Sequence, residues 1–523
     1  RGINNQLNNS LNYKGYNLNF NGSYLNSDAT NHKTNFLRHY TTLWKKYSGF
    51  TLALREDSEN NTWISKKTDT LQPNSHRYHE YGISMMYGDS LQSHAFIGYS
   101  RRIDFLPENK TLKKSSHANN YKTGFQLISE NGQQLKSTLN YRQLKVLDTS
   151  LSEYRDESSL TGRIEHSARL LNEAISSNTF YETGSGLEPL KEFVYIKVGK
   201  GRGVYQWIDY NNNDIKELNE FEIANFNDEA EYIRVFSPVR EYTRVVSNQF
   251  NQTLHIRLYR IWSEDNGIKN ILSRFSNRFS YRVTQKNKHL ALLKDLNPFP
   301  AGTPDSLVLN VGTHMRNTLS YNKTNPTFGI DYLTLYSKNK TLLLNGIDTK
   351  TSFSHVLKAR SRPIENVQIF NESELADKKL QSSYFTSKNY TIKSIENRFR
   401  VSYEPGLNTR LGLEHEYSNK RDAGKKALTK NHEIYAELKR GLSKTGNINI
   451  KSGYIHIQYE GETNSPIGYE MLEGFNPGHN FHWMIDFKKE VIKNLVLNLN
   501  YEGRSSENKK TIHIGNIQMR AIF

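Results

Sequence analysis

The stretch from Asp209 to Glu220 carries oxygen-bearing side chains at the spacing of an EF-hand-type calcium loop. Ca²⁺ takes six to eight hard oxygen ligands, so acidic or amide side chains at every second residue suit it. The carbonyl of Ile215, at position 7, adds a further oxygen, and Glu220, at position 12, can close the shell with two. The predicted metal ligands are Asp209, Asn211, Asn213, Ile215, Glu217 and Glu220.

This loop departs from the usual pattern in two respects. Position 6 is Asp214, where glycine normally permits the sharp turn, although Asp tolerates left-handed backbone better than most residues. The preceding segment, Val204 to Ile208, is predicted to be a strand rather than a helix. The alternative is an Asn/Asp-rich turn that binds nothing. If calcium binds, we expect it to stiffen a long loop rather than to act as a switch.

Other motifs give no catalytic residue. The run Gly199 to Gly203 lacks the Gly-Lys-Ser/Thr of a phosphate-binding loop, so a flexible turn is favoured. His479 and His482 would share one face only on a helix, and His482 lies in a predicted strand. No Gly-x-Ser-x-Gly nucleophile elbow occurs. A Ser/His pair assembled from distant strands, as an outer-membrane hydrolase would use, stays open as an alternative.

The elements that must position these residues show a period of two. In the last segment one parity is apolar or small, while Asn516, Gln518 and Arg520 occupy the other. The residues of that first parity are Gly515, Ile517, Met519, Ala521 and Phe523. Similar alternation occurs at 495–501, 481–487 and 399–403. Because successive side chains of a strand point to opposite faces, the pattern predicts strands with one apolar and one polar face.

The connections between these strands give a second signal. Longer connections at 417–431, 460–479 and 503–510 alternate with shorter ones at 404–408, 440–447 and 489–494. Outer-membrane barrels have short periplasmic turns and longer external loops. A soluble adhesin built from sandwiches has no reason to keep this rhythm, so it is the disfavoured alternative.

The sequence therefore predicts an all-β protein, a large transmembrane antiparallel β-barrel of about 22 strands with one long loop insertion. Residues 1–186 and 239–523 are predicted to form two parts of the barrel, and 187–238 the insertion. No run reaches the roughly 18 apolar residues that a spanning helix needs. Lipid cannot pair backbone groups, so such strands must close into a ring. The chain is expected to be the C-terminal part of a longer precursor, ending at Phe523 in a membrane strand.

The composition agrees with a barrel, in which the chain is polar on average and apolar residues alternate with polar ones only within strands. The mean hydropathy is −0.75, there are 32 tyrosines, and there is no cysteine, which excludes disulfides and thiolate metal sites. The formal charge is +17, yet Lys and Arg are spread along nearly every segment. This spread disfavours nucleic-acid binding, and basic loops suit the phosphates of outer-membrane lipid and lipopolysaccharide.

Two stretches resemble large outer-membrane barrel proteins of Bacteroidota. They are Gly468 to Gly478, followed by 480–483 and 500–504, and the run Trp207 to Phe236. The resemblance implies a Gram-negative outer membrane and a longer precursor, but no activity.

The leading functional hypothesis is a non-enzymatic barrel that serves transport or acts as a subunit of an outer-membrane assembly or secretion complex with other envelope proteins. The strand total also matches a TonB-dependent-type transporter whose plug lies elsewhere. The hydrolase and the soluble adhesin remain the other classes.

Overall fold

A computed structural model describes residues 2–521, apart from 130, 153–154, 264–265, 289–295, 300–306, 344–345, 425, 443–445, 493–494 and 508. The strands of the first part are β1 (Gly2–Tyr13), β2 (Tyr16–Asp28), β3 (His32–Tyr47), β4 (Phe50–Ser65), β5 (Thr70–Leu71), β6 (His76–Gly88), β7 (His94–Glu108), β8 (Thr111–Ile128), β9 (Gln134–Val146), β10 (Glu157–Leu170), β11 (Ile175–Lys197), β12 (Tyr205–Trp207) and β13 (Phe221–Ile223).

The remaining strands are β14 (Tyr232–Arg257), β15 (Phe275–Lys288), β16 (Val308–Tyr321), β17 (Phe328–Leu343), β18 (Gly346–Ile364), β19 (Val367–Ser382), β20 (Tyr390–Gly406), β21 (Thr409–Asp422), β22 (Leu428–Leu442), β23 (Gly446–Glu460), β24 (Gly478–Ile492), β25 (Leu495–Ser506) and β26 (Ile512–Ala521). Helices are short: α1 (Tyr259–Trp262), α2 (Ile268–Ser273), α4 (Pro466–Leu472) and the 3₁₀ turns η1 (Leu218–Glu220), η2 (Asn227–Glu229) and η4 (Thr386–Lys388). None of the helices in the described part of the chain is long and apolar enough to cross a membrane.

These strands form one 26-stranded sheet in which every recorded pairing is antiparallel. The strands β5, β12 and β13 have only two or three residues, which leaves 23 long strands against the about 22 predicted. The predicted all-β antiparallel fold is confirmed. Within the described residues, no pairing joins β1 to β26.

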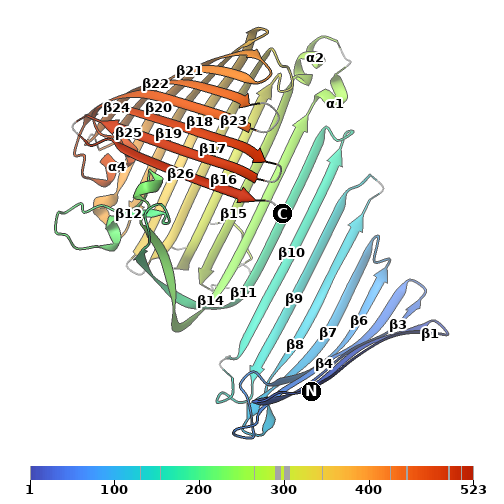
Figure 1. Ribbon diagram of the computed structural model, residues 1–523. Coiled ribbons are helices and arrows are strands. Elements are labelled where there is room, and N and C mark those ends of the chain that lie inside the picture. Colours follow the sequence, from blue (N-terminus) through green and yellow to red (C-terminus); the bar gives the residue numbers. More distant parts are fainter. Residues whose placement is uncertain are drawn as a thin grey trace.

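The sheet curls strongly along the second half of the chain. In Figure 1 the strands near the C-terminus, drawn in red, lie in front of the yellow strands, while β1 to β10 fan away from this curl. The curvature of the sheet therefore follows from the twist and register of its strands, and no layer of helices packs against it in the described residues.

The two faces of the curled sheet differ in polarity, as the period of two predicted. On the outer face of β21, Leu411 and Leu413 are 45% and 58% exposed. On the enclosed face of the same strand, Glu414 is only 5% exposed. The same holds on β6, where Ile83 and Met85 are exposed on the outer face. An apolar outside and a polar inside invert the arrangement of a water-soluble protein.

Ion pairs across neighbouring strands satisfy charges of the enclosed face between β20 and β23. Register sets Arg398 of β20 opposite Glu416 of β21, and the Arg398 Nη2 to Glu416 Oε2 distance is 2.8 Å. Two residues further along, Arg400 pairs with Glu414, which also accepts a hydrogen bond from Lys451 Nζ at 3.2 Å. Buried charges need such partners, because an unpaired buried charge costs several kcal/mol.

The connections alternate in length as predicted for the C-terminal part. Those at 407–408, 443–445 and 493–494 are short, and those at 423–427, 461–477 and 507–511 are longer. The longer ones are shorter than predicted, since β21 continues to Asp422, β22 begins at Leu428 and β25 continues to Ser506. These strand ends consist mostly of polar residues, so the alternation of apolar residues stops before the strand pairing does. The predicted final residue of the last strand, Phe523, lies outside the described residues.

Candidate functional site

The insertion grows out of a hairpin that is much longer than its neighbours. β11 has 23 residues and β14 has 26, and they pair from Ile175 with Ile256 as far as Lys197 with Tyr232. The two ends of the predicted insertion, 187–197 and 232–238, thus continue strands β11 and β14. The residues between them, 198–231, form the tip of the hairpin. Within the tip, β12 and β13 pair from Tyr205 with Ile223 to Trp207 with Phe221.

The calcium-type loop lies between β12 and β13, so strands flank it on both sides. Asp209 begins the turn: its two carboxylate oxygens accept hydrogen bonds from the backbone N–H groups of Asn213 (3.2 Å) and Asp214 (2.8 Å). Asn213 Oδ1 accepts from Ile215 N at 2.7 Å, and Asn211 Oδ1 accepts from Asn213 N at 3.1 Å. The side chains at positions 1, 3 and 5 therefore all accept hydrogen bonds from the backbone of the loop itself.

Left-handed backbone occurs at position 6, where the sequence has Asp214 in place of the usual glycine. Asp214 has φ of 57°, the conformation for which glycine is normally selected, and Asn212 has the same φ. Ile215 leaves its side chain 62% exposed, as expected for a residue that would contribute only its carbonyl. The loop thus adopts a sharp turn without glycine, because Asn and Asp tolerate this region.

Glu220, at the end of the loop, is completely buried. Its Oε2 accepts hydrogen bonds from Trp207 Nε1 at 2.8 Å and from the backbone N–H of Glu217 at 3.3 Å. Its Oε1 is buried and has no hydrogen-bond partner. A buried carboxylate oxygen without a partner is costly, and a cation ligated by it would remove that cost.

The remaining predicted ligand, Glu217, stands beside Asn211, whose Nδ2 donates to Glu217 Oε2 at 2.9 Å. Hydrogen bonds thus join Asp209, Asn211, Asn213 and Glu217 within one turn, and Glu220 lies at the end of that turn. No group of three or more His, Cys, Asp or Glu side chains suited to a metal occurs in the described ranges. A calcium shell here would depend on the amide oxygens of Asn211 and Asn213 and on a backbone carbonyl, which hard cations accept.

An arginine anchors the insertion to the far side of the sheet. Arg504 of β25 binds Asp228 with two parallel hydrogen bonds of 2.7 and 2.9 Å and reaches Glu229 Oε1 at 2.7 Å. Its guanidinium also lies 3.8 Å from the centre of the Phe226 ring. Arg504 is 6% exposed, and burial raises the pKa of the Glu229 carboxyl although Arg504 opposes that shift.

Further contacts join the insertion to α4 and η4. The Tyr469 hydroxyl of α4 donates to the carbonyl of Ile223 at 2.6 Å. Lys388 of η4 pairs with Glu222 at 2.7 Å, and Phe226 packs edge-on against Phe475 with ring centroids 5.3 Å apart.

The loop itself is also tied to the β23–β24 connection, and its residue Tyr210 is partly buried. Asn464 Nδ2 donates to the Asp209 carbonyl at 3.0 Å. Burial and, next, the Glu222 carboxylate raise the pKa of the Tyr210 phenol.

The helix α4 provides a firm platform for these contacts. Ser465 caps it by accepting a hydrogen bond from Gly468 N, and Pro466 occupies the first turn, where its missing N–H is harmless. Met471 is fully buried against Tyr390 and Ile392 of β20. Leu472 packs in a second cluster with Tyr435, Ile455 and Ile457. The platform therefore rests on the enclosed face of β20 to β23.

These contacts mean that the insertion crosses one end of the curl. In the sheet, the ten strands β15 to β24 separate β14, where the insertion ends, from β25, where Arg504 binds it. At the roughly 4.8 Å spacing of neighbouring strands, the path along the sheet is about 50 Å. Figure 1 shows β12 beside α4, with the β11–β14 hairpin arching toward the strands near the C-terminus.

Sequence reasoning singled out the loop but missed its docking residues. Arg504, Tyr469 and Phe475 entered the prediction only as parts of a resemblance. The Ser465–Pro466 pair was a usable signal for a helix start, yet nothing local marks Arg504 as the partner of residues 275 and 276 positions away.

No family model matches the chain, and no curated protein matches it. Solved structures that resemble it include BauA, the ferric preacinetobactin receptor from Acinetobacter baumannii, at 9% identity and a TM-score of 0.32, covering 99% of this chain and 76% of that one. Others are FpvA, the pyoverdine outer membrane receptor from Pseudomonas aeruginosa PAO1 (8%, TM-score 0.28, covering 100% and 77%), and FyuA, the ferric yersiniabactin uptake receptor from Yersinia pestis (8%, TM-score 0.28, covering 100% and 79%).

Proposed function

We propose that this chain forms an outer-membrane β-barrel, or most of one, with the β11–β14 insertion lying across its external end. The observation that carries the proposal is the inverted polarity of the sheet, apolar outside and charged inside. In outer-membrane barrels the longer connections face outward, and the insertion shares its end of the sheet with the connection 461–477.

The outer face has the chemistry to contact lipid and lipopolysaccharide acyl chains. A shallow groove of about 460 Å³ on this face is lined largely by apolar side chains, among them Leu52, Ile83, Met85, Ile97 and Leu139. Removing such side chains from water contributes roughly 25 cal/mol per Å² of apolar area.

We assign the barrel a non-enzymatic role, in transport or as a subunit of an outer-membrane assembly or secretion complex. The edges of β1 and β26 carry backbone groups that need partners in lipid. Closure of β1 against β26, or pairing with strands of other envelope proteins, would supply them.

We further propose that Ca²⁺ binds the loop 209–220. The carboxylates of Asp209 and Glu220, the amide oxygens of Asn211 and Asn213 and the Ile215 carbonyl would hold it, with Glu217 at position 9. The support is the buried, unpartnered Glu220 Oε1 at the end of the loop. When bound, the ion would supply positive charge to this carboxylate and stiffen the insertion without a switching role.

Membrane residence is tested by expressing the chain in an outer-membrane-competent host. We expect extraction only with detergent, and faster gel migration before boiling than after, because a closed strand ring resists unfolding in the gel. Release by salt or carbonate without detergent would contradict the proposal. A mild-detergent pull-down would then separate the two roles, since a subunit brings envelope partners with it and a solitary transporter does not.

Calcium binding is tested with Tb³⁺, whose emission Trp207 would sensitise because its Nε1 lies 2.8 Å from Glu220 Oε2. Glu220→Gln should weaken Tb³⁺ binding by more than the roughly 10- to 100-fold typical of outer-shell changes. The matched control, Glu365→Gln, removes an exposed carboxylate at the opposite end and should bind like the unmodified chain. Absence of Trp-sensitised emission that Ca²⁺ displaces would overturn the calcium assignment.

A further inference from the structure

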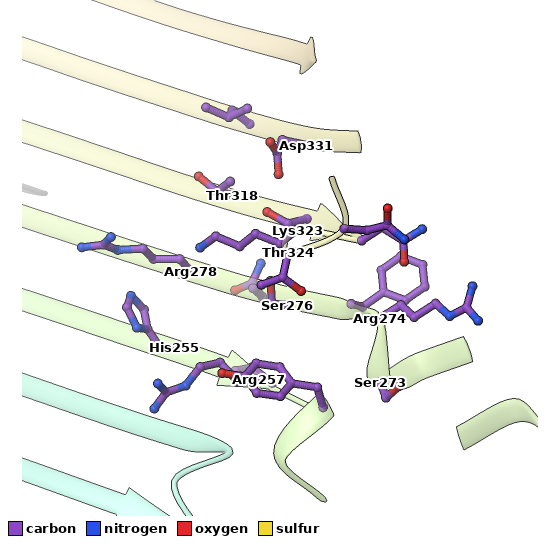
Figure 2. Close-up of a pocket in the computed structure, with 18 of the residues that line it drawn as sticks. His255, Arg257, Ser273, Arg274, Ser276, Arg278, Thr318, Lys323, Thr324 and Asp331 are labelled. Carbon is purple, nitrogen blue, oxygen red and sulfur yellow. The ribbon is translucent and has the colours of Figure 1, made fainter. Parts of the chain in front are cut away.

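A large cavity opens on the enclosed face at the end of the sheet opposite the insertion. It has a volume of about 910 Å³ and lies over the ends of β14 to β18, beside α1 and α2. Its face is the enclosed one, because the adjacent residues of opposite parity, Leu319, Tyr332 and Leu357, are exposed on the outside. Figure 2 shows His255, Arg257, Arg278 and Lys323 reaching over one stretch of sheet, with Arg274 extending at the rim.

The lining is strongly basic. Arginine and lysine contribute six of the described lining residues, namely Arg257, Arg274, Arg278, Arg316, Lys323 and Lys358. Asp331 is the sole carboxylate among the described residues of the lining. The register explains the gathering, since His255 stands opposite Arg278 and Arg257 opposite Ser276 on the neighbouring strand.

Three of these cationic groups have no ion-pair partner among the residues that the structure describes, whereas Lys358 pairs with Glu372. No ion pair is recorded for Arg278, Arg316 or Lys323 within the described residues. Arg257 Nε and His255 Nε2 are buried without a hydrogen-bond partner, although Arg257 Nη2 donates to the Glu173 carbonyl at 2.9 Å. Arg257 Nε can only donate, so an acceptor is what it lacks, whereas the role of His255 Nε2 depends on its tautomer.

The rim of the cavity is a built feature. The Arg360 guanidinium of β18 donates to the carbonyl of Asn322 at 3.1 Å and also to that of Lys323, which fixes the turn between β16 and β17. Arg360 thereby holds the backbone of Lys323 at the edge of the cavity. Donors held in place bind anions better than donors on a free loop, because less conformational entropy is lost.

We propose that this cavity binds a phosphate-bearing anion on the enclosed face of the barrel. Guanidinium groups match phosphate oxygens with paired hydrogen bonds, and several cations around one volume raise the local concentration of anions. The volume exceeds that of a single phosphate, so a solute with more than one phosphate or an organic phosphate fits it. The site lies at the end opposite the calcium loop and requires neither calcium nor the docked insertion.

The proposal is tested with detergent-purified chain and inorganic pyrophosphate, by isothermal titration calorimetry at low and high salt. We expect saturable binding that weakens with salt and falls at least about tenfold for each guanidinium removed in Arg278→Gln and Arg316→Gln. The matched control, Arg142→Gln on β9, removes an arginine outside the cavity and should bind as the unmodified chain does.

Gel migration before boiling shows that each variant still folds. No saturable binding by the unmodified chain would overturn the site. An equal loss in Arg142→Gln would do so as well, because it would show a response to overall charge alone. Membrane extraction and Tb³⁺ binding do not depend on this result, so failure here is distinguishable from failure of the proposed function.

Discussion

The two ends of the sheet treat arginine in opposite ways. At the insertion end, Arg504 is buried and fully paired with Asp228 and Glu229. At the other end, Arg278 and Arg316 face a cavity and have no ion pair among the described residues. A paired and buried guanidinium is committed to holding the protein together, whereas one aimed into open volume is available to a ligand.

This difference follows from where the carboxylates lie. The insertion brings its own acidic residues to the sheet, so every contact it makes there fixes its position. The cavity at the opposite end has six basic residues and a single described carboxylate in its lining. Among the described residues of this lining, positive charge therefore exceeds negative charge.

The largest expected effect is loss of insertion docking in Arg504→Gln. Two carboxylates that are 22% and 31% exposed would lose their cation, which costs about 3 kcal/mol at the low end for a broken buried pair. Hydrogen exchange of residues 198–231 should accelerate accordingly. The control, Arg142→Gln, should leave exchange unchanged, and full protection in Arg504→Gln would contradict the docking role.

A smaller effect is expected for Met471→Ala, which empties a fully buried position beneath α4. We expect the free energy of local opening, measured by hydrogen exchange in α4 and the insertion, to fall by about 2 kcal/mol. This value is at the low end for a buried Met→Ala change, because a short helix near water can move into the space that is left. Met519→Ala, on an exposed outer position, is the matched control. Equal exchange in both variants would show that α4 is not the platform.

Tyr469→Phe removes one hydrogen bond, to the Ile223 carbonyl, and keeps the ring. A loss of about 1 kcal/mol in the local opening free energy of the insertion is expected, as for a typical neutral hydrogen bond. Tyr403→Phe changes an exposed outer tyrosine and should have no effect. If the opening free energy fell only in Tyr403→Phe, the role given to the Tyr469 hydrogen bond would be wrong.

The smallest effect is expected for the stability of Arg278→Gln in the absence of any anion. Because this arginine has no ion pair in the described structure, its removal should change stability by no more than about 0.5 kcal/mol. Thermal loss of the fast-migrating gel form measures it. A large destabilisation would show that Arg278 is structural, like Arg504.

The sequence by itself determined the strands and the loop, because both depend on near neighbours. Alternation at 399–403 and 481–487 reports which face each side chain takes, and that is a property of consecutive residues. The positions of Asp209, Asn211 and Asn213 follow in the same way from a local turn. Strand ends such as Asp422 and Ser506 were misjudged because polar residues can pair as well as apolar ones.

Only the tertiary structure decided what the insertion touches and where the basic cavity lies. Arg504 meets Asp228 across 276 residues, and Arg278 joins His255 and Thr318 only through strand register. Such meetings depend on how far the sheet curls and on the register that pairs its strands. Curl and register sum over many strands, so no short stretch of sequence specifies them.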